Sequence, residues 1–104
     1  MKMQERSDKR SLELHREVVK QLRLNPSLWD VPLRNIDRWT DKDGSLPVPY
    51  KIWKDILTSM PHETIIKIVL SKSQRSTQLR SSSPFIGIID KETRNKIFQK
   101  YKMH

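Results

Sequence analysis

The sequence predicts an all-α protein, a compact bundle of about five helices. Two observations lead to this prediction: the 104 residues include only two glycines, and the apolar residues recur mostly at helical spacing. A sandwich or barrel needs more tight turns than so few glycines provide. The length suits one domain with one core. We therefore expect a flexible N-terminal segment over residues 1–8 and a single helical domain over residues 9–104.

The first helix is expected to end at about Leu24, before the stop signal Asn25-Pro26. Its apolar face follows the spacing of an amphipathic helix and includes one histidine. The residues of this face are Leu12, His15, Val18, Val19 and Leu22.

The second helix is expected to begin near Asp30. Leu33, Ile36 and Trp39 continue an apolar stripe, but Pro32 lacks the backbone N–H that an interior helical position needs. The proline therefore has to lie close to the start of the helix. The tryptophans at 29, 39 and 53 are more typical of a core than of a nucleobase-stacking surface.

Prolines also mark the starts of the next two helices. The segment 41–45 is a loop by composition, and its glycine suits a left-handed turn. Pro47 and Pro49 fit the start of a third helix, and Pro61 fits the first turn of a fourth. The β-branched run 65–70 is also compatible with a strand, so this segment has two interpretations.

The last third of the chain is expected to hold a short helix, a loop and a final helix. Residues 74–80 suffice for one or two helical turns. Asp90 suits the N-cap of the final helix, with Glu92 in its first turn and Lys100 near its end, which matches the helix dipole.

An extended Ser-Pro-Phe loop precedes the final helix. Pro84 fixes its own φ and favours an extended Ser83, and Gly87 permits a turn. Phe85 and Ile86 need an apolar cover, which either the protein's own core or a partner supplies. In the second case an exposed Phe85 anchor has the composition of an interface hot spot.

The charge of the chain is +9, and it is concentrated toward the C-terminus. Residues 61–104 carry nine basic side chains against three acidic ones, whereas residues 25–60 are balanced. Such a surface suits an acidic protein, RNA or DNA.

Several chemistries lack their usual residues. The absence of cysteine removes disulfides and the common zinc sites, and two isolated glycines make no phosphate-binding loop. His15, His62 and His104 lie far apart, and His15 fits a structural or interface role better than catalysis. We expect no catalytic residue, metal or cofactor. The N-terminus and the lack of long apolar runs predict a cytoplasmic protein without membrane contact.

A set of short motifs extends over most of residues 12–98. They are Leu14-His-Arg-Glu-Val18, Asn35-Ile-Asp-Arg-Trp39, Trp53, Leu79-Arg-Ser-Ser-Ser-Pro-Phe-Ile-Gly87 and Arg94. The most specific is Arg-x-x-Ser-Pro-Phe-x-Gly, which occupies residues 80–87. Together these motifs resemble those of short bacterial antitoxin-type proteins encoded beside toxin genes. The prolines at 32, 47 and 49 depart from the pattern.

The resemblance implies a non-enzymatic helical protein that occludes a toxin and helps to regulate its own operon. Arginines around an apolar loop would direct it to an acidic toxin or enzyme. The residues expected to bind the partner are Arg80, Ser83, Pro84, Phe85, Ile86, Arg94, His15 and Arg16.

The alternative is a basic transcriptional regulator that binds operator DNA or RNA through its phosphates. A helix-turn-helix over 61–70 and 73–80 is a weak form of this alternative, because the second segment is short and offers only Leu79 as an apolar anchor. The residues expected to contact nucleic acid are Lys72, Arg75, Lys91, Lys96 and Lys100.

Overall fold

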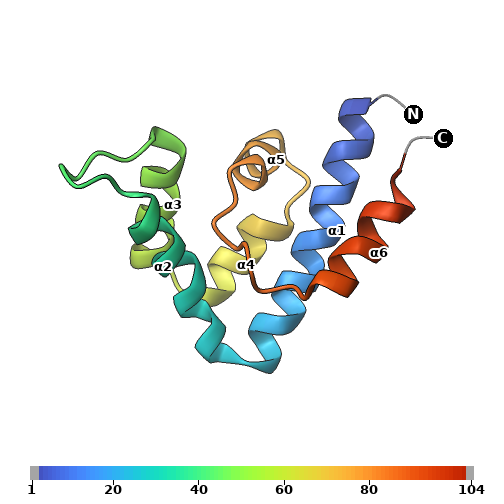
Figure 1. Cartoon of the computed structure of the whole chain (residues 1–104), viewed down its shortest axis with the longest axis horizontal. Coiled ribbons are helices and arrows are strands. Elements are labelled where there is room, and N and C mark those ends of the chain that lie inside the picture. Colours follow the sequence, from blue (N-terminus) through green and yellow to red (C-terminus); the bar gives the residue numbers. More distant parts are fainter. Residues whose placement is uncertain (1–2, 103–104) are drawn as a thin grey trace.

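The computed structural model describes residues 3–102, and within them every regular element is helical. The all-α prediction is therefore confirmed, with six α-helices and one 3-10 helix in place of about five helices (Figure 1). In chain order the elements are α1 (Met3–Leu24), η1 (Pro26–Trp29), α2 (Asp30–Trp39), α3 (Val48–Ser59), α4 (His62–Leu70), α5 (Gln74–Ser81) and α6 (Lys91–Lys100).

The helices form three neighbouring groups. Figure 1 shows α1 beside α6 at one side, α2 with α3 at the other, and α4 with α5 between them. Helix α1 contacts η1, α4, α5 and α6, whereas α3 contacts α2 and α4. The long α1 thus connects the C-terminal helix to the centre of the molecule.

Helix α1 extends further toward the N-terminus than its apolar stripe indicated. It begins at Met3, so residues 3–8 form its first turns, and residues 1–2 lie outside the described part. Gln4 donates a hydrogen bond to Asp8 at 3.1 Å, one helical turn apart. The apolar stripe begins only at the buried Leu12, which is why the pattern alone suggested a later start.

The proline and glycine signals correctly marked the boundaries of the middle helices. Pro32 lies in the first turn of α2, where backbone N–H groups have no partner within the helix. Gly44 has φ 85°, as expected for the left-handed turn of the 41–45 loop. Pro47 caps α3, and Pro49 lies in its first turn.

Residues 65–70 are helical, and the strand interpretation of this run is wrong. They belong to α4, whose N-cap is Pro61. Ile65, Ile66 and Val69 are all buried, and their spacing places them on one face of the helix. Burial of this face outweighs the modest helix propensity of β-branched side chains.

Trp53 is the centre of the core. Its side chain is 0% exposed, and its indole Nε1 donates a hydrogen bond to the carbonyl oxygen of Leu79 at 2.9 Å. Trp29 and Trp39 are partly buried against the same core. The expectation that the tryptophans serve the core is thus confirmed, with Trp53 bound to α5 as well.

Candidate binding groove

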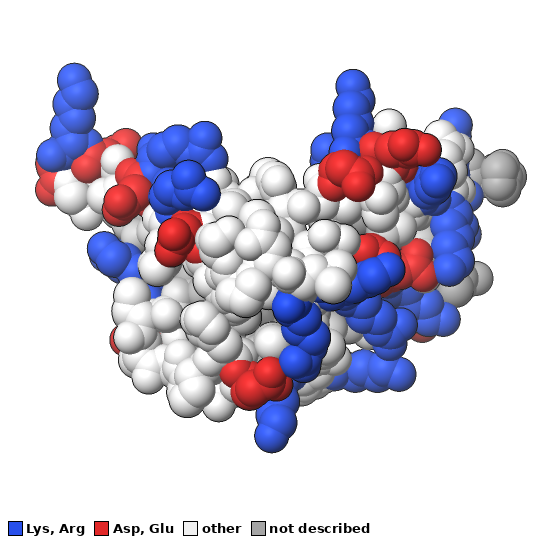
Figure 2. Space-filling view, turned by 90° about the horizontal axis from the view of Figure 1, so that it is seen from below, with Lys and Arg blue, Asp and Glu red and all other residues white. Residues whose placement is uncertain are grey.

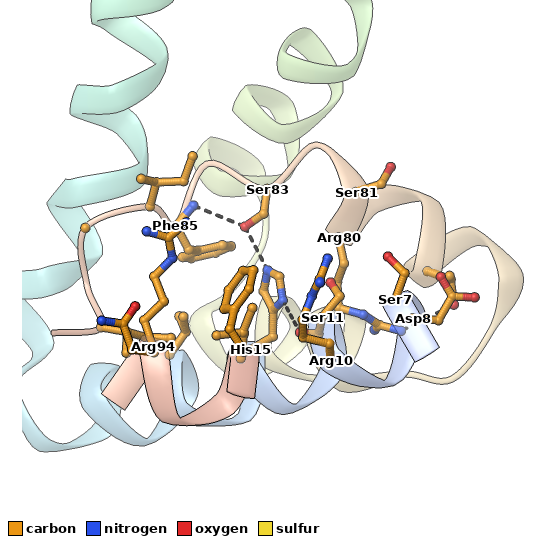
Figure 3. Close-up of a pocket in the computed structure, with 18 of the residues that line it drawn as sticks. Ser7, Asp8, Arg10, Ser11, His15, Arg80, Ser81, Ser83, Phe85 and Arg94 are labelled. Carbon is orange, nitrogen blue, oxygen red and sulfur yellow. Dashed lines mark hydrogen bonds between the residues drawn. The ribbon is translucent and has the colours of Figure 1, made fainter. Parts of the chain in front are cut away.

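A groove of about 810 Å³ lies against α1, bordered by α5, the loop 82–90 and α6 (Figure 3). We call it the α1 groove. Its polar lining is rich in serine and contains one acidic side chain, Asp8. Its apolar lining consists of Leu14, Val18, Phe85, Ile86, Ile89 and Phe98, and its basic lining of Arg10, Arg80, Lys91 and Arg94.

Asn35 of α2 holds the Ser-Pro-Phe loop in place. Its side-chain Nδ2 donates hydrogen bonds to the carbonyl oxygens of Pro84 at 2.8 Å and Ile86 at 2.9 Å. Arg38 donates to the Asn35 side-chain oxygen. Gly87 follows with φ 95°, a left-handed conformation that glycine adopts readily. The loop is therefore fixed by contacts from a helix far away in sequence.

Phe85 points into the core, and the expectation of an exposed Phe85 anchor is wrong. Its side chain is only 3% exposed. Its ring meets Trp53 edge-on at 5.5 Å between centroids and Trp29 at 6.4 Å. Pro84 is also fully buried. The protein's own aromatic residues thus supply the cover that Phe85 needs.

Ile86 is the large apolar side chain that the loop leaves in solvent. It is 65% exposed, and it borders the α1 groove. Because Asn35 binds the Ile86 carbonyl oxygen, the backbone that presents this side chain is held in one conformation. An apolar group fixed in advance loses little entropy when a partner covers it. Ile86 is therefore the better candidate for an anchor.

Arg80 is buried, so the expectation that it contacts a partner at the surface does not fit its position. It is 5% exposed, and its Nη1 donates to the carbonyl oxygens of Val69 at 2.7 Å and Ser71 at 2.6 Å. Those carbonyls end α4, where the helix dipole favours a cation. Burial lowers the pKa of Arg80, yet a guanidinium retains its charge at neutral pH. Arg80 thus ties α5 to the end of α4.

His15 is the connection between α1 and the loop. The carbonyl oxygen of Ser11, 2.6 Å from Nδ1, can only accept, so Nδ1 carries the proton. Nε2 then accepts from the Ser83 hydroxyl at 2.8 Å, and that oxygen accepts from the Phe85 N–H at 3.2 Å (Figure 3). Burial lowers the pKa of His15 to about 4, so the ring is neutral at pH 7.

A serine bonded to a histidine also resembles the nucleophile and base of some hydrolases. Here the second ring nitrogen of His15 is held by the Ser11 carbonyl oxygen in place of a carboxylate. A histidine with a pKa of about 4 is a weak base at neutral pH. The geometry favours a structural role, in which Ser83 and His15 fasten the loop to α1.

Two arginines share one aromatic ring at the α1 groove. The guanidinium carbon of Arg10 lies 4.5 Å from the centroid of the Phe98 ring, and that of Arg94 lies 5.1 Å from it. Within residues 3–102 neither arginine forms an ion pair. Both guanidinium groups are therefore available to an anionic group of a partner.

The structure gathers most of the candidate residues into this one groove. His15, Arg80, Ser83, Phe85, Ile86 and Arg94 line it, whereas Arg16 is exposed on α1 outside the lining. Sequence reasoning missed Arg10. Its position could have been inferred from its spacing, because Arg10 lies four residues before Leu14 and therefore on the same face of α1. That face lines the groove.

The residues proposed to contact nucleic acid fall into two sets. Lys72 lies in the turn between α4 and α5 and Arg75 in the first turn of α5, whereas Lys91, Lys96 and Lys100 belong to α6. Lys96 pairs with Glu92 at 3.5 Å, and Lys100 pairs with Glu13 at 2.7 Å. Figure 2 shows basic side chains on the α1 and α6 side interspersed with acidic ones.

Helices α4 and α5, which correspond to the two segments of the helix-turn-helix interpretation, are joined by the three residues 71–73. Figure 1 shows α5 nearly along its axis and α4 from the side, so the two helices are not parallel. Ser73 caps α5 by accepting from the Ser76 N–H at 3.1 Å. The exposed side chains of α5 are Gln74, Arg75, Gln78 and Ser81.

Among the described residues, no group of three or more histidine or acidic side chains is placed to hold a metal ion. None of the helices in residues 3–102 has the length and apolar character needed to cross a bilayer. No protein-family model matches the chain, and no curated protein or solved structure matches it significantly.

Proposed function

We propose that this chain is a small, non-enzymatic protein-binding module of the bacterial cytoplasm that neutralises a cognate protein, as an antitoxin or inhibitor. The observation that supports the proposal is the α1 groove, where the exposed Ile86 lies beside unpaired arginines. An apolar anchor rimmed by charged groups is typical of an interface hot spot.

The rigidity of the loop also supports this proposal. Asn35 binds the backbone on both sides of Phe85, and the buried Phe85 ring anchors the loop from below. Ile86 is consequently presented on a fixed backbone at the mouth of a preformed groove. A preformed site of this kind binds without a large ordering cost, and the positive charge of the chain steers it toward an acidic partner.

A nucleic-acid-binding regulator is the second candidate function. The observation that favours it is the pair α4 and α5, whose second helix exposes Gln74, Arg75 and Gln78. Glutamine and arginine side chains are suited to base edges. This candidate ranks second because Lys96 and Lys100 already pair with carboxylates, which weakens the phosphate-binding surface of α6.

Affinity capture from the native host tests both candidates. The tagged chain is incubated with nuclease-treated lysate at roughly 0.15 M and 0.5 M salt, and both protein and nucleic acid are identified. Two matched variants accompany it: Ile86→Ala alters the groove, and Arg75→Ala alters α5. The proposal expects a stoichiometric protein that withstands nuclease and high salt and is lost with Ile86→Ala.

The opposite pattern would favour the regulator. In that case lysate without nuclease yields nucleic acid at low salt, high salt releases it, and Arg75→Ala reduces it while Ile86→Ala does not. Recovery of no stoichiometric protein in any condition would contradict the inhibitor proposal.

A further inference from the structure

The α1 groove is long enough for a peptide segment. Its lining on α1 runs from Gln4 to Val18, which at 1.5 Å per residue corresponds to about 21 Å. That length accommodates about six residues of an extended chain at roughly 3.3 Å per residue. The volume of about 810 Å³ is also within the usual range for binding pockets.

The charge of the groove is complementary to an acidic segment. Arg10, Lys91 and Arg94 line it, and the buried Arg80 adds a positive charge from α5. Asp8 is the one acidic side chain among the lining residues. Because a guanidinium binds a carboxylate or a phosphate through two parallel N–H groups, the two unpaired arginines suit an anionic partner of either kind.

The apolar lining indicates that charge alone does not define the occupant. Leu14, Val18 and Ile89 line the groove from α1 and the loop, and Ile86 stands at its border. These apolar side chains can neither donate hydrogen bonds to a phosphodiester backbone nor neutralise its charge. The guanidinium groups of Arg10 and Arg94 also lie over the Phe98 ring, where they would compete with base stacking.

We infer that the α1 groove binds an acidic segment of a partner protein, in which carboxylates alternate with large apolar side chains. The carboxylates pair with Arg10 and Arg94, which Phe98 holds in position, and the apolar side chains cover Leu14, Ile86 and Ile89. This inference rests on the proposed function and adds the chemistry of the partner.

Selection from a displayed library of random 16-residue peptides on the full chain tests the inference. We expect enriched peptides to be acidic and to contain large apolar residues. R10E/R94E should weaken binding of the selected peptides at least tenfold. The control K51E/K54E makes the same change in net charge on exposed residues of α3, and it should change their binding by less than about threefold.

Folding of each variant is checked by circular dichroism. If R10E/R94E does not fold, R10Q/R94Q removes the charges while keeping long polar side chains, and the tenfold loss is expected there. The inference is overturned if no peptide is enriched, if the enriched peptides are basic or lack apolar residues, or if the arginine variants bind them as the wild type does. An equal loss in K51E/K54E would overturn it too.

The two proposals fail in different ways. If host capture recovers a stoichiometric protein but the library result is negative, the acidic-segment inference fails and the protein-binding function stands. If capture recovers nucleic acid alone, and a DNA duplex binds in a manner that depends on Arg10 and Arg94, both fail and the groove is a phosphate-binding surface.

Discussion

Phe85 and Ile86 are adjacent in sequence, but one is buried and the other is exposed. Alanine at position 85 should therefore lower the stability of the fold, whereas alanine at position 86 should weaken partner binding. Phe85 is 3% exposed and packs edge-on against Trp53 and Trp29, whereas Ile86 is 65% exposed. Truncating a buried phenylalanine costs about 3–5 kcal/mol, from lost transfer energy and the cavity left behind. The two aromatic contacts place Phe85→Ala near the middle of that range, at about 4 kcal/mol.

A loss of this size is large for a domain of 104 residues. At about 4–8 °C per kcal/mol it lowers the Tm by roughly 20 °C. Ile86→Ala should change the free energy of unfolding by less than about 0.5 kcal/mol, because it removes a solvent-exposed side chain. Thermal and urea unfolding followed by circular dichroism measure both.

The binding measurements complete the comparison. Ile86→Ala should weaken partner binding while leaving the fold intact. A free energy of unfolding for Phe85→Ala within about 1 kcal/mol of the wild type, or a larger loss of stability in Ile86→Ala than in Phe85→Ala, would contradict the assignment of Phe85 to the core.

Three further predictions concern the residues that fix the loop and α4. His15 has a folded-state pKa of about 4 against 6.5 in the unfolded chain, so the unfolded state binds more protons between these values. The free energy of unfolding should be greatest above about pH 6.5 and should fall by up to about 3 kcal/mol as the pH drops toward 4. Urea titrations at several pH values should show that this free energy depends less on pH in His15→Gln. Asn35→Ala leaves two carbonyl oxygens of the loop without their donor. The free energy of unfolding should fall by about 2–3 kcal/mol, and hydrogen exchange at the Phe85 amide, which donates to the Ser83 hydroxyl, should accelerate, whereas unchanged exchange would contradict the role of Asn35. Arg80→Met removes the donor to the end of α4 and should destabilise the fold by about 2–4 kcal/mol in chemical unfolding; a stability equal to the wild type would show that α4 does not need this cap.

Local signals in the sequence placed most helix boundaries. Asp90 caps α6 by accepting from the Thr93 N–H at 2.7 Å, and Pro32 lies in the first turn of α2, as its missing N–H requires. In both cases the relevant interaction involves residues within one turn. Such interactions can be inferred without knowledge of the tertiary fold.

The orientation of the loop could not be predicted in the same way. Whether Phe85 or Ile86 faces the core depends on Asn35, 49 residues before Pro84, and on the position of Trp53. Arg80 looked like a surface residue because the carbonyls that it caps are backbone groups of α4, which a side-chain pattern does not reveal.

The composition of the α1 groove depends on tertiary contacts as well. Arg10 and Phe98 meet because α1 packs against α6, which no sequence spacing indicates. The beginning of α1 was missed for a related reason. Its first turns lack an apolar stripe because their polar side chains line the groove.

If the chain binds a partner protein at the α1 groove, removing the Ile86 side chain should weaken the complex. The most direct measurement is the affinity of the captured partner for the wild type, for Ile86→Ala and for Lys51→Ala on α3, determined by titration calorimetry. We predict a loss of about 2 kcal/mol or more, roughly 30-fold in Kd, for Ile86→Ala and no change for Lys51→Ala. Equal affinity for all three proteins would contradict this prediction.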